Sequence, residues 1–130
     1  MGTSAGSEVP RSLTPREEAV LVEMITRGRH QDDDVVVTAA DRSRWLAQVP
    51  GTRAGARCGC GSCPSIELTD AAGETPDMQD DRVVLEAGAT GALLLLFIDD
   101  DRLSYLELAP LSDKTSFRHF PDPQRLDMRT

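Results

Sequence analysis

Apolar residues in the first part of the chain recur at helical spacing and follow a helix-start motif. Residues 14–27 carry a broad apolar face of alanine, valine, leucine, methionine and isoleucine. Thr14, Pro15 and Glu17 stand at the positions of a capping box with proline in the first turn. Gly28 follows directly, and glycine commonly ends helices. The pattern therefore predicts a helix over these residues.

A second helix is predicted over roughly residues 39–48. Thr38 and Asp41 repeat the spacing of a cap and its reciprocal partner. This helix directs Trp45 and the apolar residues that follow it toward a core, and Pro50 ends it because proline cannot continue the hydrogen-bond ladder.

Beyond position 51 the pattern changes to short extended runs separated by turn-forming residues. The run 91–98 is the most apolar and is expected at the centre of a sheet. An aspartate run at 99–101 predicts a hairpin turn into the last strand. On that strand, strict alternation places Leu103 and Tyr105 on one face and Leu106 and Leu108 on the other. The predicted strands span residues 52–57, 65–69, 82–87, 91–98 and 103–108.

Together these elements predict an α+β fold, with two N-terminal helices packed on one face of a four- to five-stranded, mostly antiparallel sheet. Short connections favour antiparallel pairing, because a parallel neighbour needs a long crossover. A single domain is expected over residues 14–110, after a disordered N-terminal tail at 1–13. Residues 111–130 are expected to form an irregular C-terminal tail, which Phe117, Phe120 and Leu126 hold against the domain.

Charge and hydropathy narrow the classes of partner. The 130 residues include 22 acidic and 14 basic ones, for a net charge of -8. This balance argues against a nucleic-acid binder and against adhesion to anionic membranes, since both need a basic surface. The longest apolar run, 92–98, is too short to span a bilayer, and residues 1–11 lack the apolar core of a signal peptide. A cytoplasmic protein is expected, with an unknown protein partner or self-association.

The most distinctive chemistry lies in three cysteines within six positions, Cys58, Cys60 and Cys63, with glycines between them. Glycine allows sharp backbone turns, so the C-x-C-x-x-C segment can bring several sulfurs together. Because the cytoplasm keeps thiols reduced, ligand or redox chemistry is favoured over a structural disulfide. Three thiolates suit a soft or borderline ion such as copper(I) or zinc. A four-ligand zinc site would need one more donor, for which His119 and His30 are candidates.

Two alternatives to metal binding remain open for this segment. Cys60 and Cys63 form a CxxC pair and could act in thiol–disulfide exchange. However, Pro64 and the alternating residues after it predict a strand, so the helix N-terminus that usually acidifies such a thiol is not expected. The segment could also be a purely structural turn, in which cysteine packs as a small apolar residue.

Other polar residues favour a binding or accessory protein over an enzyme. Glu67, Glu86 and Glu107 are expected on neighbouring strands, on the sheet face that points away from the apolar residues. Paired carboxylates could serve in acid–base chemistry if one were desolvated, but a solvated sheet face explains them more simply. The remaining hypothesis is a protein-interaction module of the immunity or regulator type, whose acidic surface suits a basic partner.

The chain carries the motifs RCGCGSCPSIEL at 57–68 and IDDDRLSYLE at 98–107, after a helical TPRE segment at 14–17. Together these motifs resemble those of a group of short uncharacterised actinobacterial proteins. The resemblance covers roughly residues 14–108. Many members have CGCGCPS without a residue matching Ser62, so the position of the last sulfur differs here. The group has no assigned activity, and the resemblance implies an actinobacterial source and a shared fold but no catalytic residue.

Overall fold

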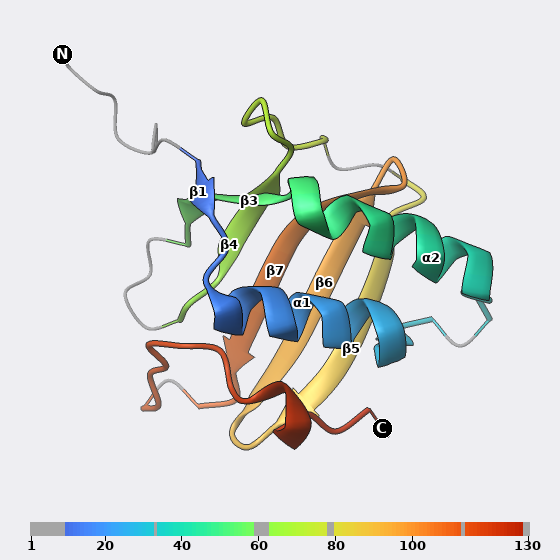
Figure 1. Ribbon diagram of the computed structural model, residues 1–130. Coiled ribbons are helices and arrows are strands. Elements are labelled where there is room, and N and C mark those ends of the chain that lie inside the picture. The colour runs from blue at the N-terminus through green and yellow to red at the C-terminus, as the bar shows by residue number, and fades with distance from the viewer. Residues whose placement is uncertain (1–9, 33, 59–62, 78–79, 113, 129–130) are drawn as a thin grey trace, which may run out of the picture.

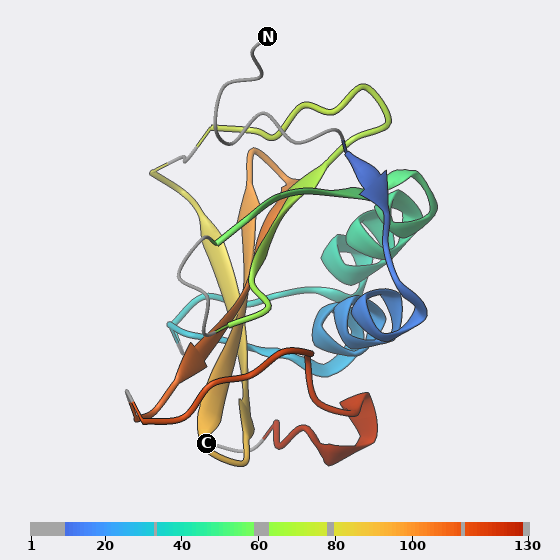
Figure 2. The same cartoon turned by 90° about the vertical axis from the view of Figure 1, so that its left-hand side faces the viewer.

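A computed structural model describes residues 10–32, 34–58, 63–77, 80–112 and 114–128. These residues form a seven-stranded antiparallel sheet, and two helices cover one of its faces (Figures 1 and 2). The α+β class and the antiparallel sheet are therefore as predicted.

Both helices begin with the predicted capping boxes. Helix α1 spans Pro15–Arg27 and helix α2 spans Ala39–Gln48. At the start of α1, the amide of Glu17 donates to Oγ1 of Thr14 over 3.1 Å, and the amide of Thr14 donates to Oε1 of Glu17 over 2.8 Å. These reciprocal bonds satisfy backbone donors that have no partner inside the helix.

The strands follow the predicted runs, with two short additions. The sheet order is β1-β3-β4-β7-β6-β5-β2. The strands are β1 (Arg11–Ser12), β2 (Arg29–His30), β3 (Arg53–Arg57), β4 (Ile66–Thr69), β5 (Val83–Ala89), β6 (Ala92–Asp99) and β7 (Arg102–Pro110). Single 3₁₀ turns follow α2 at Val49–Gly51 and lie near the C-terminus at Pro123–Arg125.

The predicted strand count and helix placement need correction. Strand β1 precedes α1 and pairs with β3, and β2 lies between the helices and pairs with β5. The helices are therefore inserted between strands and are not a separate N-terminal unit. Strands of two residues cannot show alternation, so the pattern predicted only the five longer ones. Strand β1 lies within the stretch expected to be a tail, most of which falls outside the described residues.

The predicted faces of β7 are also wrong at one position. Leu103, Leu106 and Leu108 are all buried in the core, whereas Tyr105 is only half-buried and lies on the other face. The pairing of β6 with β7 shifts register after Phe97, which adds one residue to β7. Such a bulge reverses the in–out alternation beyond it. Ser104 occupies the bulge, and its hydroxyl donates to the carbonyl of Phe97 over 3.0 Å.

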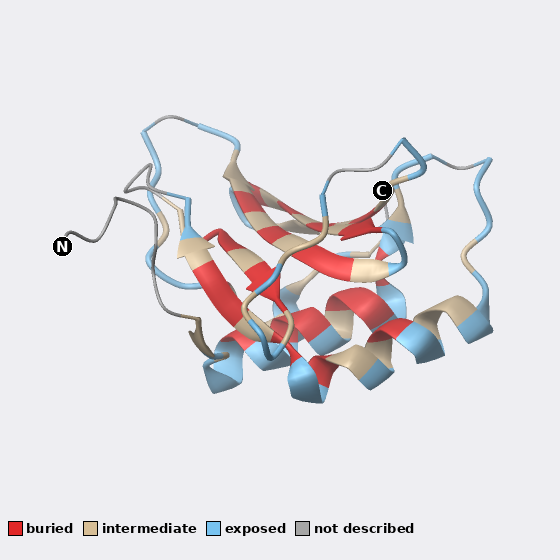
Figure 3. Cartoon of the chain, turned by 90° about the horizontal axis from the view of Figure 1, so that it is seen from above, coloured by how far each residue is buried: buried red, intermediate tan, exposed pale blue. Residues whose placement is uncertain are grey.

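The core lies between the helices and the inner face of the sheet. Along the central strands, buried residues alternate with partly exposed ones (Figure 3). The outer face carries Glu67 and Tyr105 side by side, and Leu95 between Glu86 and Glu107. The three glutamates thus lie on the face away from the helices, as expected. They do not all lie on neighbouring strands, because β6 separates Glu86 on β5 from Glu107 on β7.

The C-terminal segment returns across the sheet end beneath α1 (Figure 1). Phe120 is buried in the core cluster, and Phe117 and Leu126 pack against it. An isolated bridge joins Gly88 to Asp127. The three apolar residues therefore hold this irregular segment against the domain, and the segment forms one side of the candidate site.

Candidate functional site

The cysteine segment joins the end of β3 to the start of β4, and we call it the cysteine turn; residues 59–62 within it lie outside the described ranges. Arg57 pairs with Ile66, and the amide of Cys58 donates to the carbonyl of Ser65 over 3.0 Å. Cys58 is exposed and Cys63 is half-buried, whereas Cys60 lies outside the described residues. The strand pairing therefore brings the two ends of the segment together.

Tyr105, on the outer face of the sheet, lies near both described cysteines. Burial is the largest cause that raises the pKa of this phenol above 10.0, and negative charge at Cys58, Glu107 and Cys63 raises it further. A hydrogen bond with the side chain of Cys58 acts in the same direction. Cys58 and Cys63 therefore lie near one phenol, although no residue pattern linked Tyr105 to the cysteines.

The two candidate histidine ligands lie in different places. His119 lines the same cavity as Cys63. His30 lies on β2, four strand spacings from β4, or roughly 19 Å at about 4.8 Å per spacing. Its Nδ1 also accepts the amide of Asp32 over 2.8 Å. His30 is therefore too distant to complete a site at the cysteine turn. Within the described ranges, no group of three metal-ligating side chains comes together.

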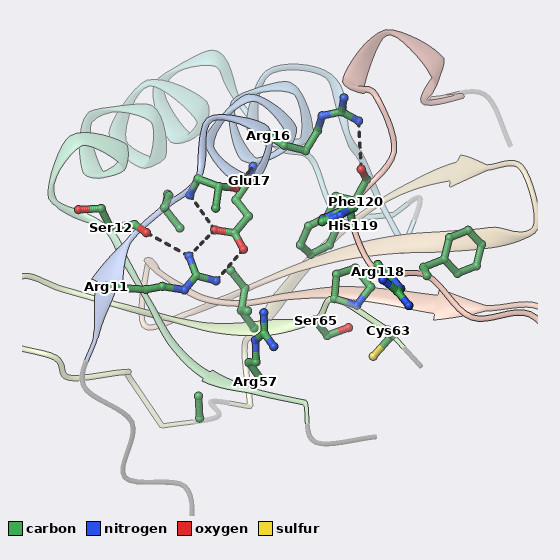
Figure 4. A pocket seen from close by; sticks show the side chains of 16 residues that line it. Arg11, Ser12, Arg16, Glu17, Arg57, Cys63, Ser65, Arg118, His119 and Phe120 are labelled. Carbon is green, nitrogen blue, oxygen red and sulfur yellow. Dashed lines mark hydrogen bonds and ion pairs between the residues drawn. The ribbon is translucent and has the colours of Figure 1, made fainter. Parts of the chain in front are cut away.

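A cavity of about 1000 Å³ opens beside the cysteine turn. Three segments enclose it: the start of α1 with the residues before it, the facing ends of β3 and β4, and the C-terminal segment (Figure 4). The sequence predicted each segment separately, but no pattern indicated that they meet. The lining residues are Arg11, Ser12, Leu13, Thr14, Arg16, Glu17, Ala56, Arg57, Cys63, Pro64, Ser65, Ile66, Phe117, Arg118, His119 and Phe120.

The cavity is basic although the protein is acidic. Four of the chain's 14 basic residues line it, against one of its 22 acidic residues, Glu17. A second cavity, of about 500 Å³ at the β2 edge, is lined by Asp32, Asp80 and Asp81 with Arg82 as its arginine. The positive lining is therefore a local property of the first cavity.

Glu17 is already neutralised by Arg11. The Arg11 guanidinium donates to both carboxylate oxygens, over 2.8 and 2.9 Å. Burial alone would raise the pKa of Glu17, but the bonds from Arg11 and Thr14 outweigh it and hold the pKa below 4.5. Because both oxygens are occupied, this carboxylate is a poor general base.

The other arginines differ in what they contact. Arg16 donates to the carbonyl of Phe120 over 3.1 Å and so ties the C-terminal segment to α1. Arg57 and Arg118 are exposed, and neither has a hydrogen-bond or ion-pair partner among the described residues. Figure 4 shows the Arg11–Glu17 pair at one end of the cavity and Arg118, His119 and Phe120 toward the other. Two guanidinium groups are thus available to a ligand.

The fold and site define a small α+β protein with an arginine-lined cavity beside a cysteine turn. Comparison with known proteins finds no matching family model, no matching curated protein and no matching solved structure. The resemblance to short actinobacterial proteins therefore stays a prediction. No helix among the described residues is long and apolar enough to cross a membrane.

Proposed function

We propose that this chain is a small binding or accessory protein whose ligand occupies the cavity beside the cysteine turn. The cavity itself carries the proposal. Its volume of about 1000 Å³ matches the upper end of small-molecule sites. Apolar residues, among them the buried Ile66 and Phe120, lie in its walls beside polar and charged side chains that can orient a ligand.

The chemistry of the lining favours binding over catalysis. Glu17 is held by two bonds from Arg11 and one from Thr14, so it serves the structure of the helix start. Arginine stays protonated at neutral pH and acts as a hydrogen-bond donor. A cavity that offers donors and a neutralised carboxylate is suited to holding a ligand in a fixed orientation.

Amide chemical shifts test whether the cavity is where ligands bind. We expect a set of small charged and neutral compounds, added to ¹⁵N-labelled protein, to perturb the amides of the non-proline residues within 11–17, 56–58, 63–66 and 117–120. The amides at the opposite sheet edge, around His30, serve as the internal control. Perturbation confined to that edge, or none with any compound, would contradict the proposal.

A second candidate function is metal binding at Cys58, Cys60 and Cys63, by a soft or borderline ion such as zinc or copper(I). The observation that favours it is that Tyr105 hydrogen-bonds with the side chain of Cys58 and also lies within electrostatic range of Cys63, so the two thiols lie near the same phenol. His119, on the neighbouring cavity wall, is the better-placed fourth ligand. Thiolate and imidazole donors match the preferences of both ions.

Native mass spectrometry after anaerobic purification with zinc or copper(I) tests this candidate. We expect one ion per chain, lost on Cys58→Ser or Cys63→Ser. His30→Ala is the matched control for His119→Ala, because only the second histidine lies beside the turn. The apo mass alone, with either metal present, would exclude the site.

The other hypotheses have less support from the described residues. Thiol–disulfide exchange by Cys60 and Cys63 stays a prediction, because Cys60 lies outside the described ranges. Alkylation rates across pH would decide it, since a nucleophilic cysteine reacts well below the ordinary thiol pKa. The interaction-module hypothesis, the unknown protein partner and the cytoplasmic location likewise stay predictions.

A further inference from the structure

We propose that the ligand of this cavity is a small organic oxyanion, carrying a phosphate or carboxylate group that Arg57 and Arg118 bind. This inference rests on the proposed function and adds the chemical class of the ligand. Neither arginine belongs to the cysteine turn's metal chemistry, so the inference is independent of the second candidate.

The distribution of charge is the first line of support. With His119 neutral, four arginines and one glutamate leave the lining with a charge of about +3, in a chain whose net charge is -8. Guanidinium groups that line the same cavity repel one another. An oxyanion relieves that repulsion, whereas a neutral or cationic ligand does not.

The availability of the donors is the second line of support. Arg11 is engaged with Glu17, and Arg16 donates to the carbonyl of Phe120. Arg57 and Arg118 have no such partner within the described part of the chain. A guanidinium presents a planar fork of donors that matches the two oxygens of a carboxylate or phosphate. The two residues come from different segments, so a shared anion would bridge β3 and the C-terminal segment.

The start of α1 does not supply the anion site. The capping box satisfies the amides of Thr14 and Glu17 and places a carboxylate at that end. The charged group of the ligand is therefore expected toward Arg57 and Arg118, at the end of the cavity away from Glu17.

Apolar residues beside the arginines indicate that the ligand has more than a charged group. Phe120 is buried, whereas Phe117 and Leu13 are half-buried, and all three line the cavity. Their side chains offer an apolar wall for a ring or a short chain. A bare inorganic ion would leave this wall in contact with water, so an organic body attached to the oxyanion fits better.

Isothermal titration with three matched compounds tests the inference. Phenyl phosphate and benzoate carry the two candidate oxyanions on the same ring, and benzamide is the neutral counterpart. We expect measurable binding of at least one anion and at least tenfold weaker binding of benzamide. Stronger binding of phenyl phosphate than of benzoate indicates a phosphate ligand, and the reverse order indicates a carboxylate ligand.

Variants that each replace one arginine by uncharged glutamine locate the anion within the cavity. Arg57→Gln and Arg118→Gln should each weaken binding of the preferred anion by about tenfold, because each removes a charge-assisted hydrogen bond. Arg125→Gln is the matched control, since it changes the net charge equally at an exposed position outside the lining. We expect less than a twofold change there. All three positions are exposed, and circular dichroism verifies that each variant folds.

The outcomes separate this inference from the proposed function. If benzamide binds as tightly as the anions and perturbs the cavity amides, the cavity is a ligand site but the oxyanion inference is overturned. If Arg125→Gln weakens anion binding as much as Arg57→Gln and Arg118→Gln, the effect is one of net charge and the inference is also overturned. If no compound binds, both are overturned.

Discussion

Glu17 joins the start of α1 to β1 and to the wall of the cavity, and its removal gives the sharpest stability prediction. Its side chain is 10% exposed, and it accepts two bonds from Arg11 and one from the amide of Thr14. Glu17→Gln keeps the size of the side chain and one oxygen acceptor, so the hydrogen bond from the backbone amide of Thr14 can persist. It removes the negative charge that faces Arg11.

The expected loss of stability depends on how far Arg11, the partner of Glu17, is exposed to solvent. Charge-assisted hydrogen bonds contribute about 1.5–3 kcal/mol when well buried. The Arg11 side chain is 40% exposed, so solvent screens the pair, and exposed ion pairs contribute about 0.2–1 kcal/mol. We expect Glu17→Gln to lower the free energy of unfolding by about 1 kcal/mol at pH 7. Glu17→Ala, which also removes the capping bond, should cost about 2 kcal/mol.

The pH dependence gives the prediction a second, independent measure. Because the folded state holds the pKa of Glu17 below 4.5, the carboxylate contributes stability that is fully present above pH 4.5. That contribution is lost as the pH falls through the lowered pKa. The stability difference between the wild-type protein and Glu17→Gln should therefore shrink as the pH drops below about 4.5.

Urea unfolding followed by circular dichroism, at pH 7 and at pH 3, provides the measurement. Glu18→Gln is the control, because Glu18 is the next residue in the same helical turn and is exposed. Equal losses for the two variants at pH 7 would refute the role assigned to the Arg11–Glu17 pair. So would a loss for Glu17→Gln that is the same at both pH values.

Two further predictions use the core and the cysteine turn. Tyr105 is the chain's one tyrosine, so the absorbance of tyrosinate measures its ionisation alone. Because its pKa is raised above 10.0, Tyr105 should remain less than half ionised at pH 10. Cys58→Ser should move this pKa toward that of an exposed tyrosine. A titration unchanged by Cys58→Ser would show that the thiol is not beside the phenol. Leu96→Ala, at a fully buried position, should cost about 2–5 kcal/mol in urea unfolding. Leu111→Ala, at a position 70% exposed, should change stability by less than about 0.5 kcal/mol, and similar losses for both would contradict the described core.

The helices and the longer strands were predictable because their signals are local. The capping residues Thr14 and Thr38 act within one turn of their helices, so their spacing in the sequence is enough to locate both helix starts. The long strands were predictable from their apolar runs. The hydrogen bond from Trp45 to the side chain of Asp101, over 2.8 Å, then fixes α2 against the β6–β7 turn.

What the sequence could not reveal depends on contacts between distant residues. Strands β1 and β2 have two residues each and exist only because an edge of the sheet is present to pair with them. The bulge in β7 arises from its pairing with β6, so alternation alone placed Tyr105 on the wrong face.

The candidate site shows the same limit. Net charge is a property of the whole chain, so it gave no sign of a local basic cavity. The arginines that line this cavity are distant in sequence, from Arg11 to Arg118. Of the residues that line this cavity, only Cys63 and His119 were candidate site residues from the sequence. Their shared cavity follows from the path of the C-terminal segment, which has little periodicity of its own.

The central claim is that the cavity binds a small organic oxyanion between Arg57 and Arg118. A crystal structure of the protein soaked with phenyl phosphate tests it most directly. The account predicts a phosphate whose oxygens lie about 2.7–2.9 Å from nitrogens of both guanidinium groups. It also predicts that the phenyl ring rests against Phe117 and Phe120. A phosphate bound elsewhere on the protein, with the cavity filled by solvent, would contradict it.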